Sequence, residues 1–285
     1  MALTPRVHEE GRSRLVAYDH GAHLASWELE KEPVVWLSPA AVLDGSTAIR
    51  GGVPICFPWF ADGPDGEHSP GHGVVRTATW SPAPARDDEV WAWELQDTGV
   101  ADARGAHQIP GPFHLRYAVR LSPGAPEGSP ALDLHLELHN PGSTAYTVEV
   151  ALHTYLAVGD VERIRIEGLD GAHYLDKVTG RDEHQAGALG LTGETDRVYD
   201  RSGPVQVHDP VHARVLELAP RGATQTVVWN PWAKRSAAAD DLAADSWRGF
   251  VCVESAASGQ RPLTMAPGQT RTLGCSLAAR TVRPV

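Results

Sequence analysis

Two side chains at the ends of apolar segments have the chemistry to move protons. His153 lies in the segment YTVEVALHTYL, on the face of the extended chain opposite to two valines and a leucine. Glu254 follows four apolar residues in FVCVE. A histidine with an ordinary pKa of about 6.5 donates and recovers protons near neutral pH, and burial raises the pKa of a glutamate towards the range of a general base. His153 and Glu254 are therefore a candidate acid and base.

Both side chains also have structural explanations. The chain has 14 histidines, and histidine is commonly half buried, so His153 could be a hydrogen-bonded structural residue. Glu254 could form an ion pair with one of the many arginines, since such pairs also perturb carboxylates. The spacing alone does not separate these alternatives.

A long irregular segment, residues 48–80, could hold a polar ligand. It contains a Gly-Gly pair followed by two prolines, which excludes a regular helix and predicts a shaped loop. Arginines at either end could bind an anion, and aromatic faces beside polar groups suit a sugar ring. The alternatives are ordinary surface arginines and core aromatics. The loop presents four candidate binding side chains: Arg50, Trp59, His72 and Arg76.

Metal and nucleotide sites are less favoured. The segment DLHLELH places four potential ligands on one strand face, but ligands along one extended strand lie too far apart to converge, so a solvated polar face is the preferred interpretation. A second set in the 48–80 loop is weaker still. GHGVVR begins like a dinucleotide fingerprint but lacks the helix that should follow. The two sets considered for a metal are Asp133, His135, Glu137 and His139, and Asp62, Glu67, His68 and His72. We therefore expect neither a metal site nor a dinucleotide site in these segments.

Alternation of apolar and polar residues predicts the elements that position these groups. The clearest strands are residues 113–121 and 132–139, which an Asn-Pro-Gly turn follows, and we expect them to form an antiparallel pair. Only residues 233–245 look helical, and residues 97–112 and 168–210 read as loop-rich. This pattern predicts an all-β, antiparallel sandwich or barrel with few short helices, in a single domain over residues 1–285. The other expected strands are residues 13–19, 23–29, 33–38, 90–95, 146–156, 163–167, 213–218, 226–229, 250–254 and 271–277.

Composition narrows the class of protein. The net charge of −11 argues against nucleic-acid binding, which normally requires a basic face. All but three of the 25 basic residues are arginine. No apolar run approaches the length of a membrane span, and the first residues lack the apolar region of a secretory signal. Three cysteines without a paired spacing suggest a reducing compartment. We therefore expect a cytoplasmic monomer that binds a small molecule and associates with neither nucleic acid nor a membrane.

Six segments, in order along the chain, resemble the hexose-6-phosphate mutarotases (glucose-6-phosphate 1-epimerases) of the aldose 1-epimerase superfamily. Together they span about four-fifths of the sequence. They are IRGGVPICFPWF, HGVVRTATW, ALHTYLAVGDV, TDRVYD, VVWNPW and FVCVESA.

The resemblance implies a large β-sandwich of the galactose mutarotase type that needs neither metal nor cofactor. His153 then matches the general acid and Glu254 the general base of the family. His72 and Asp196 match residues that bind the sugar, and Arg50 and Arg76 match the arginines that hold the 6-phosphate. The expected partner is a small sugar phosphate.

The sequence thus predicts an isomerase that interconverts the α and β anomers of an aldohexose 6-phosphate, with glucose 6-phosphate the favoured substrate. One group must remove the C1-hydroxyl proton while another protonates the ring oxygen. Two alternatives stay open: an epimerase of unphosphorylated aldoses, and a β-sandwich that binds carbohydrate without catalysis.

Overall fold

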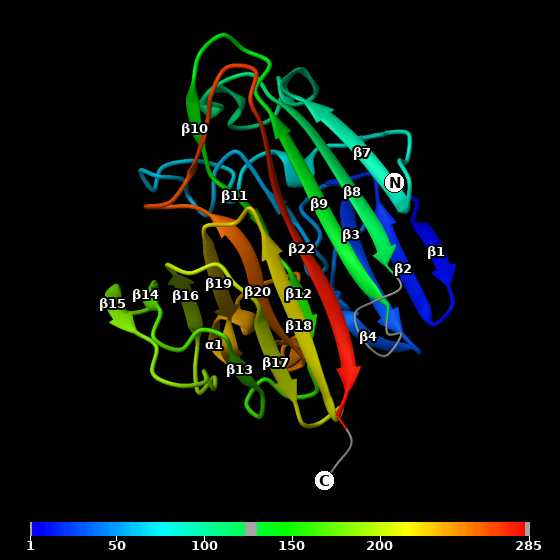
Figure 1. The fold of residues 1–285 in the computed structure, drawn as a ribbon, viewed down its shortest axis with the longest axis vertical. Helices are drawn as coiled ribbons and strands as arrows, with labels where there is room; N and C mark the ends of the chain where they lie inside the picture. The colour runs from blue at the N-terminus through cyan, green and yellow to red at the C-terminus, as the bar shows by residue number, and fades with distance from the viewer. Residues whose placement is uncertain (1, 123–129, 283–285) are drawn as a thin grey trace.

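A computed structural model describes residues 2–122 and 130–282, and antiparallel strands dominate it (Figure 1). The larger sheet has 12 strands in the order β1-β2-β3-β4-β12-β20-β19-β16-β14-β15, with β11 and β5 joined to it beside β20. Its strands are β1 Arg6–Glu10, β2 Ser13–Tyr18, β3 His23–Leu29, β4 Glu32–Val35, β5 Ile55–Cys56, β11 Val150–Leu152, β12 Tyr155–Ala157, β14 His173–Asp176, β15 Arg181–His184, β16 Thr195–Tyr199, β19 Gln225–Asn230 and β20 Phe250–Ala257.

The second sheet has eight strands in the order β13-β17-β18-β22-β9-β8-β7-β6, and a two-stranded β10-β21 ribbon is separate. These strands are β6 Ser81–Pro82, β7 Glu89–Gln96, β8 His114–Ser122, β9 Ala131–His139, β10 Tyr146–Val148, β13 Arg165–Glu167, β17 Val205–Asp209, β18 Arg214–Arg221, β21 Leu263–Met265 and β22 Thr270–Thr281. The short helices are α1 Trp232–Ala237 and the 3₁₀ turns η1 Val75–Thr77, η2 Asp97–Val100, η3 Ala106–Gln108 and η4 Ser246–Gly249. The predicted all-β fold class and the predicted pairing of β8 with β9 are confirmed.

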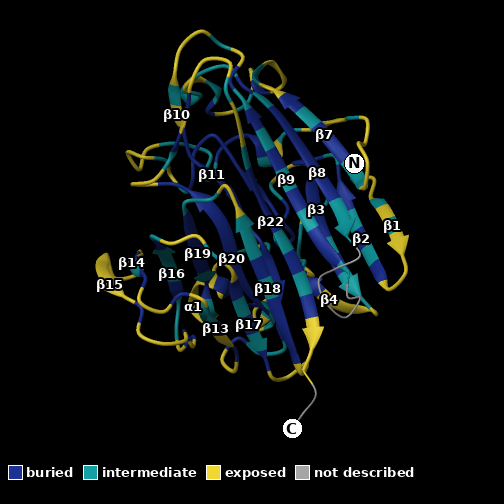
Figure 2. Cartoon of the chain, viewed as in Figure 1, coloured by how far each residue is buried: buried dark blue, intermediate teal, exposed yellow. Residues whose placement is uncertain are grey.

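The core lies between the two sheets, where buried residues concentrate (Figure 2). On β9, four leucines with at most 1% exposure alternate with partly exposed polar residues, as the period of two predicts. On β20, Val251 and Val253 join this core, whereas Phe250 and Cys252 pack in a separate cluster on the other face of the sheet. Glu254 follows the same alternation and lies on that second face. The apolar pattern of β20 therefore directs the carboxylate away from the core.

Two expectations about local structure are wrong in part. The expected helix 233–245 ends at Ala237, because the chain then turns so that Leu242 packs against β12 and β20 and Asp241 contacts Arg50. Residues 168–210 are not simply a loop, since β14, β15, β16 and β17 lie there. These strands have at most five residues, and β15 is exposed throughout. β17 does alternate, with Val205 and Val207 buried, but over too few residues to be distinguished from a loop. No helix within the described ranges has the length and apolar character needed to span a membrane.

Candidate active site

Strand register places His153 opposite Glu254. β11 pairs with β20 through Leu152 and Ser255, and β12 pairs with β20 through Tyr155 and Cys252. The residues between these pairs, His153 and Glu254, therefore face each other on neighbouring antiparallel strands. His153 Nε2 lies 3.5 Å from Glu254 Oε1. Two residues about a hundred positions apart in sequence thus meet on one face of the larger sheet.

The surroundings of this pair shift both protonation equilibria. Burial lowers the pKa of His153 to about 3, and the charges of Arg76 and Arg50 act in the same direction. Burial, with the charge of Asp196, raises the pKa of Glu254 well above its ordinary value. The two shifts are those of a pair that shares one proton, carried by Glu254 in the free protein, and this proton can move to His153 when a substrate changes the local charge. Within the described structure, His153 Nδ1 and Glu254 Oε2 have no hydrogen-bond partner, which leaves bonding capacity for a ligand.

A tight glycine turn fixes Arg50. Gly51 has φ 98° and packs so closely that a Cβ there would lie 2.7 Å from the Cα of Leu37. Arg50 Nε donates to Asp241 Oδ2 at 3.0 Å, and its Nη1 donates to the hydroxyl of Tyr155 at 3.2 Å. The arginine is thus held in one place with part of its donor capacity used.

Arg50 is connected to the His153–Glu254 pair through one tyrosine. The ring of Tyr155, which accepts the hydrogen bond from Arg50, stacks on the ring of His153 with centroids 5.0 Å apart and an interplanar angle of 16°. The position of the arginine and that of the histidine are therefore set by the same tyrosine.

Arg76 approaches the cavity from η1 with most of its donors available. Its Nη2 donates to the carbonyl of Gly71 at 2.8 Å, and it forms no ion pair with any carboxylate that the structure describes. The turn that precedes it requires Gly73, where φ is 80° and a Cβ would lie 1.9 Å from the carbonyl oxygen of Phe57. Arg76 is therefore a partly buried positive charge that can bind an anion in the cavity.

His72, in the same turn, is a hydrogen-bond donor to the cavity. The backbone N–H of Ala61 donates to His72 Nδ1 at 3.3 Å, and this bond assigns the ring proton to Nε2. Burial, with the charge of Arg76, lowers the pKa of His72 well below its ordinary value, so the ring is neutral at neutral pH. A neutral imidazole with Nε2–H suits a sugar hydroxyl.

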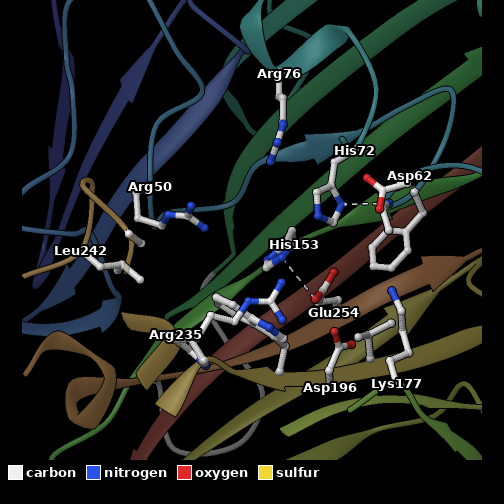
Figure 3. A pocket seen from close by; sticks show the side chains of 16 residues that line it. Arg50, Asp62, His72, Arg76, His153, Lys177, Asp196, Arg235, Leu242 and Glu254 are labelled. Atoms are coloured by element: carbon white, nitrogen blue, oxygen red, sulfur yellow. Dashed lines mark hydrogen bonds and ion pairs between the residues drawn. The ribbon is translucent and has the colours of Figure 1, made fainter. Parts of the chain in front are cut away.

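These groups surround a cavity of about 290 Å³ (Figure 3). Its volume is at the small end of the range for ligand pockets, about 300–1,000 Å³, and suits a monosaccharide. Trp229 on β19 and Phe60 supply apolar walls. Six of the seven predicted site residues line it: Arg50, His72, Arg76, His153, Asp196 and Glu254.

Trp59 is the predicted residue that the structure does not bring to the cavity. It is 1% exposed, its Nε1 donates to the carbonyl of Pro70 at 2.8 Å, and its ring packs against His68. Successive residues of an extended segment point in opposite directions, so its neighbour Phe60 faces the cavity and Trp59 faces inward. Trp59 therefore supports the loop and does not line the site.

Several residues of the site were not predicted from the sequence. Lys177, Arg235 and Asp62 line the cavity, and Tyr155 and Asp241 hold Arg50. Lys177 lies in the stretch that reads as loop, and Asp241 lies in the expected helix. The only available signal was that Lys177 is one of just three lysines in an arginine-rich chain.

The polar face of β9, considered for a metal, is engaged in ordinary surface contacts. Ser122 donates to Asp133 at 2.6 Å, and Arg86 donates to Glu137 at 2.8 Å. Across the part of the chain that the structure describes, no three His, Cys, Asp or Glu side chains are grouped as metal ligands.

The fold and the site define a class of protein: an all-β sandwich with a buried histidine–glutamate pair under a cavity of sugar size on one sheet. Residues 6–278 match the family model described as aldose 1-epimerase, and the chain belongs to this family.

Curated relatives carry the provisional name glucose-6-phosphate 1-epimerase. One from Cenchrus ciliaris is 30% identical over 261 residues, which cover 88% of this chain and 77% of the relative. One from Escherichia coli K12 is 31% identical over 244 residues, which cover 83% of this chain and 77% of the relative. These relatives are similar over most of both sequences.

Solved structures agree in fold. A protein from Salmonella typhimurium, provisionally named a mutarotase, superposes with a TM-score of 0.84 at 26% identity and covers 98% of this chain and 94% of its own. Galactose 1-epimerase from Lactobacillus acidophilus NCFM has a TM-score of 0.69 at 12% identity, covering 99% and 95% of the two chains, which shows the shared fold alone.

Proposed function

We propose that the protein interconverts the α and β anomers of an aldohexose 6-phosphate, with glucose 6-phosphate the first candidate. The observation that carries the proposal is the His153–Glu254 pair, 3.5 Å apart and buried beneath a cavity that two arginines border. The names of the relatives from Cenchrus ciliaris and Escherichia coli support the same substrate.

The reaction needs one proton acceptor and one proton donor. Glu254 accepts the proton of the C1 hydroxyl while His153 donates a proton to the ring oxygen, and the C1–ring-oxygen bond breaks to leave an open-chain aldehyde. Rotation about C1–C2 exposes the other face of the carbonyl. The ring oxygen then attacks C1, the protons return, and no atom is gained or lost. Each correctly placed group typically supplies about 10²–10⁴-fold in rate.

The remaining side chains orient the sugar. Arg50 and Arg76 bind the phosphate, whose charge compensates the arginine that lacks a carboxylate partner. His72 and Asp196 bind ring hydroxyls. In the free protein the positive charges of Arg50 and Arg76 lower the pKa of His153. A bound phosphate neutralises these charges, so protonation of His153 becomes more favourable. Substrate binding thereby favours the histidine as proton donor.

Anomeric exchange followed by NMR tests the proposal. Wild-type protein should accelerate exchange of glucose 6-phosphate well beyond the buffer rate, and glucose to a much smaller extent. Equal acceleration of both sugars would support an epimerase of unphosphorylated aldoses. Binding without any acceleration would support a non-catalytic carbohydrate-binding sandwich.

The protein is further proposed to act as a cytoplasmic monomer with a single domain over residues 1–285. All three cysteines are buried and free, in keeping with a reducing compartment. One core cluster contains residues from Leu15 to Ala279, which supports a single folding unit. Light scattering that gave twice the mass of one chain would contradict the monomer.

A further inference from the structure

Lys177 brings a positive charge to the cavity from the side opposite to the phosphate arginines. It follows β14, and its backbone N–H donates to the carbonyl of Asp196 at 2.7 Å. Its Nζ lies 5.7 Å from the centroid of the Phe60 ring, in a cation–π contact. In Figure 3, Arg50 and Arg76 lie on one side of the His153–Glu254 pair, and Lys177 and Asp196 lie on the other.

The ammonium of Lys177 has no anion assigned to it. It forms no ion pair with any residue in the described ranges, whereas Arg50 is paired with Asp241 at 3.0 Å and Arg235 with Glu194 at 3.2 Å. The strand contact and the Phe60 ring keep the side chain at the cavity. Its three donors are therefore available to a bound molecule.

The connectivity of the sugar determines which group reaches Lys177. In an aldohexose 6-phosphate the ring oxygen separates C5, which bears the phosphorylated arm, from C1, and C2 follows C1 on the far side. With the phosphate at the arginines, the ring oxygen at His153 and the C1 hydroxyl at Glu254, C2 points towards Asp196 and Lys177. This step rests on the proposed function.

We propose that Lys177 is a specificity-determining residue for the C2 substituent. It donates a hydrogen bond to a C2 hydroxyl and repels the ammonium of a 2-amino sugar. Asp196 alone would attract that ammonium, so the lysine is what favours an oxygen at this position. Burial raises the pKa of Asp196 and the charge of Lys177 opposes that rise, in keeping with two groups that share one binding position.

The test compares kcat/KM for glucose 6-phosphate and glucosamine 6-phosphate at about pH 6, where an amino group of pKa near 8 is protonated. Wild type should prefer glucose 6-phosphate by at least about tenfold, the size expected for like charges a few ångströms apart at a partly solvated site. Lys177→Met should reduce this preference about tenfold, and Lys177→Arg should retain it. Lys234→Met, on the exposed face of α1, is the matched control and should leave the ratio unchanged.

A third substrate, 2-deoxyglucose 6-phosphate, isolates the hydrogen bond. Loss of the C2 oxygen should lower kcat/KM several-fold more in wild type than in Lys177→Met. The inference would be overturned if Lys177→Met left the ratio of kcat/KM for glucose 6-phosphate and glucosamine 6-phosphate unchanged. It would also be overturned if Lys177→Met lowered kcat/KM equally for all three sugars, because Lys177 would then contact a group that they share. If wild type accelerates no exchange of glucose 6-phosphate, the proposed function fails first and this inference with it.

Discussion

Replacement of Arg76 by methionine should separate phosphate binding from the chemistry. Arg76 is the cavity arginine without a carboxylate partner among the described residues, and a single bond to the carbonyl of Gly71 positions it. Methionine preserves much of the side-chain volume and removes the charge. The expected result is a large loss of kcat/KM for glucose 6-phosphate with little change for glucose.

The size of the expected loss follows from the hydrogen bond between Arg76 and the phosphate. A hydrogen bond to a charged group contributes about 1.5–3 kcal/mol. Unlike Arg50, Arg76 forms no ion pair with a carboxylate in the described part of the chain that would offset its attraction for a phosphate, so we expect about 2 kcal/mol. With about 1.4 kcal/mol for each tenfold change, that is a loss of roughly 30-fold in kcat/KM for the phosphorylated sugar. Glucose lacks the phosphate and should lose less than about threefold.

Anomeric exchange measured by NMR at several concentrations of each sugar gives kcat and KM for both substrates. The control is Arg86→Met, at an exposed arginine that pairs with Glu137 of β9. This substitution should leave kcat/KM unchanged for both sugars. An equal loss for glucose and glucose 6-phosphate in Arg76→Met would refute the assignment of Arg76 to the phosphate.

Three further predictions follow from the site. Arg50→Met leaves Asp241 unpaired beside the phosphate, so it should lower kcat/KM for glucose 6-phosphate at least about tenfold. Adding Asp241→Asn to this variant should restore part of the loss, and no restoration would exclude charge repulsion as the cause. The pKa of His153 is lowered to about 3 and that of Glu254 is raised above its ordinary 4.5, so the pair should still hold one proton above pH 4.5, and kcat should fall only where Glu254 loses it. A tenfold rise in kcat centred near pH 6.5, as an ordinary histidine would give, would contradict these shifts. The stability of Glu254→Gln relative to wild type should be greater at pH 7 than at pH 4, because burial raises the pKa of Glu254 and a rise in pH therefore stabilises the unfolded state of wild type more than its folded state. Thermal unfolding checks this, at about 2–4 °C for each kcal/mol, and an equal difference at both pH values would contradict the raised pKa.

The sequence predicted strands with a clear run of apolar residues, such as β9 and β20, and missed short or fully exposed strands, such as β17 and β15. The four leucines of β9 alternate with polar residues, and the valines of β20 alternate with Phe250, Cys252 and Glu254, so both strands were identified and the orientation of Glu254 followed. β15 is exposed on both faces, and its pairing with β14 depends on the surrounding sheet. The expected helix beyond Ala237 was wrong because contacts of Asp241 and Leu242 outweigh local helix propensity.

The residues of the candidate site that were predicted are those whose side-chain chemistry and surrounding sequence motif indicate the same role. His153 and Glu254 stood out as polar residues at the ends of apolar segments, but only strand register shows that they are neighbours. Trp59 was assigned to the sugar because its type suits one, and nothing in the sequence distinguished it from Phe60, which faces the cavity instead. Lys177 reaches the cavity through a pairing between distant strands, which no local pattern encodes.

The participation of Glu254 in anomer interconversion is tested most directly by one comparison of variants. The exchange rate of glucose 6-phosphate should be measured by NMR for wild type, Glu254→Gln and the control Glu217→Gln, a glutamate on β18 that hydrogen-bonds Gln206. Wild type and the control should accelerate exchange equally, and Glu254→Gln should be about 10²–10⁴-fold slower. Glu254→Gln with more than a tenth of the wild-type rate would contradict the account.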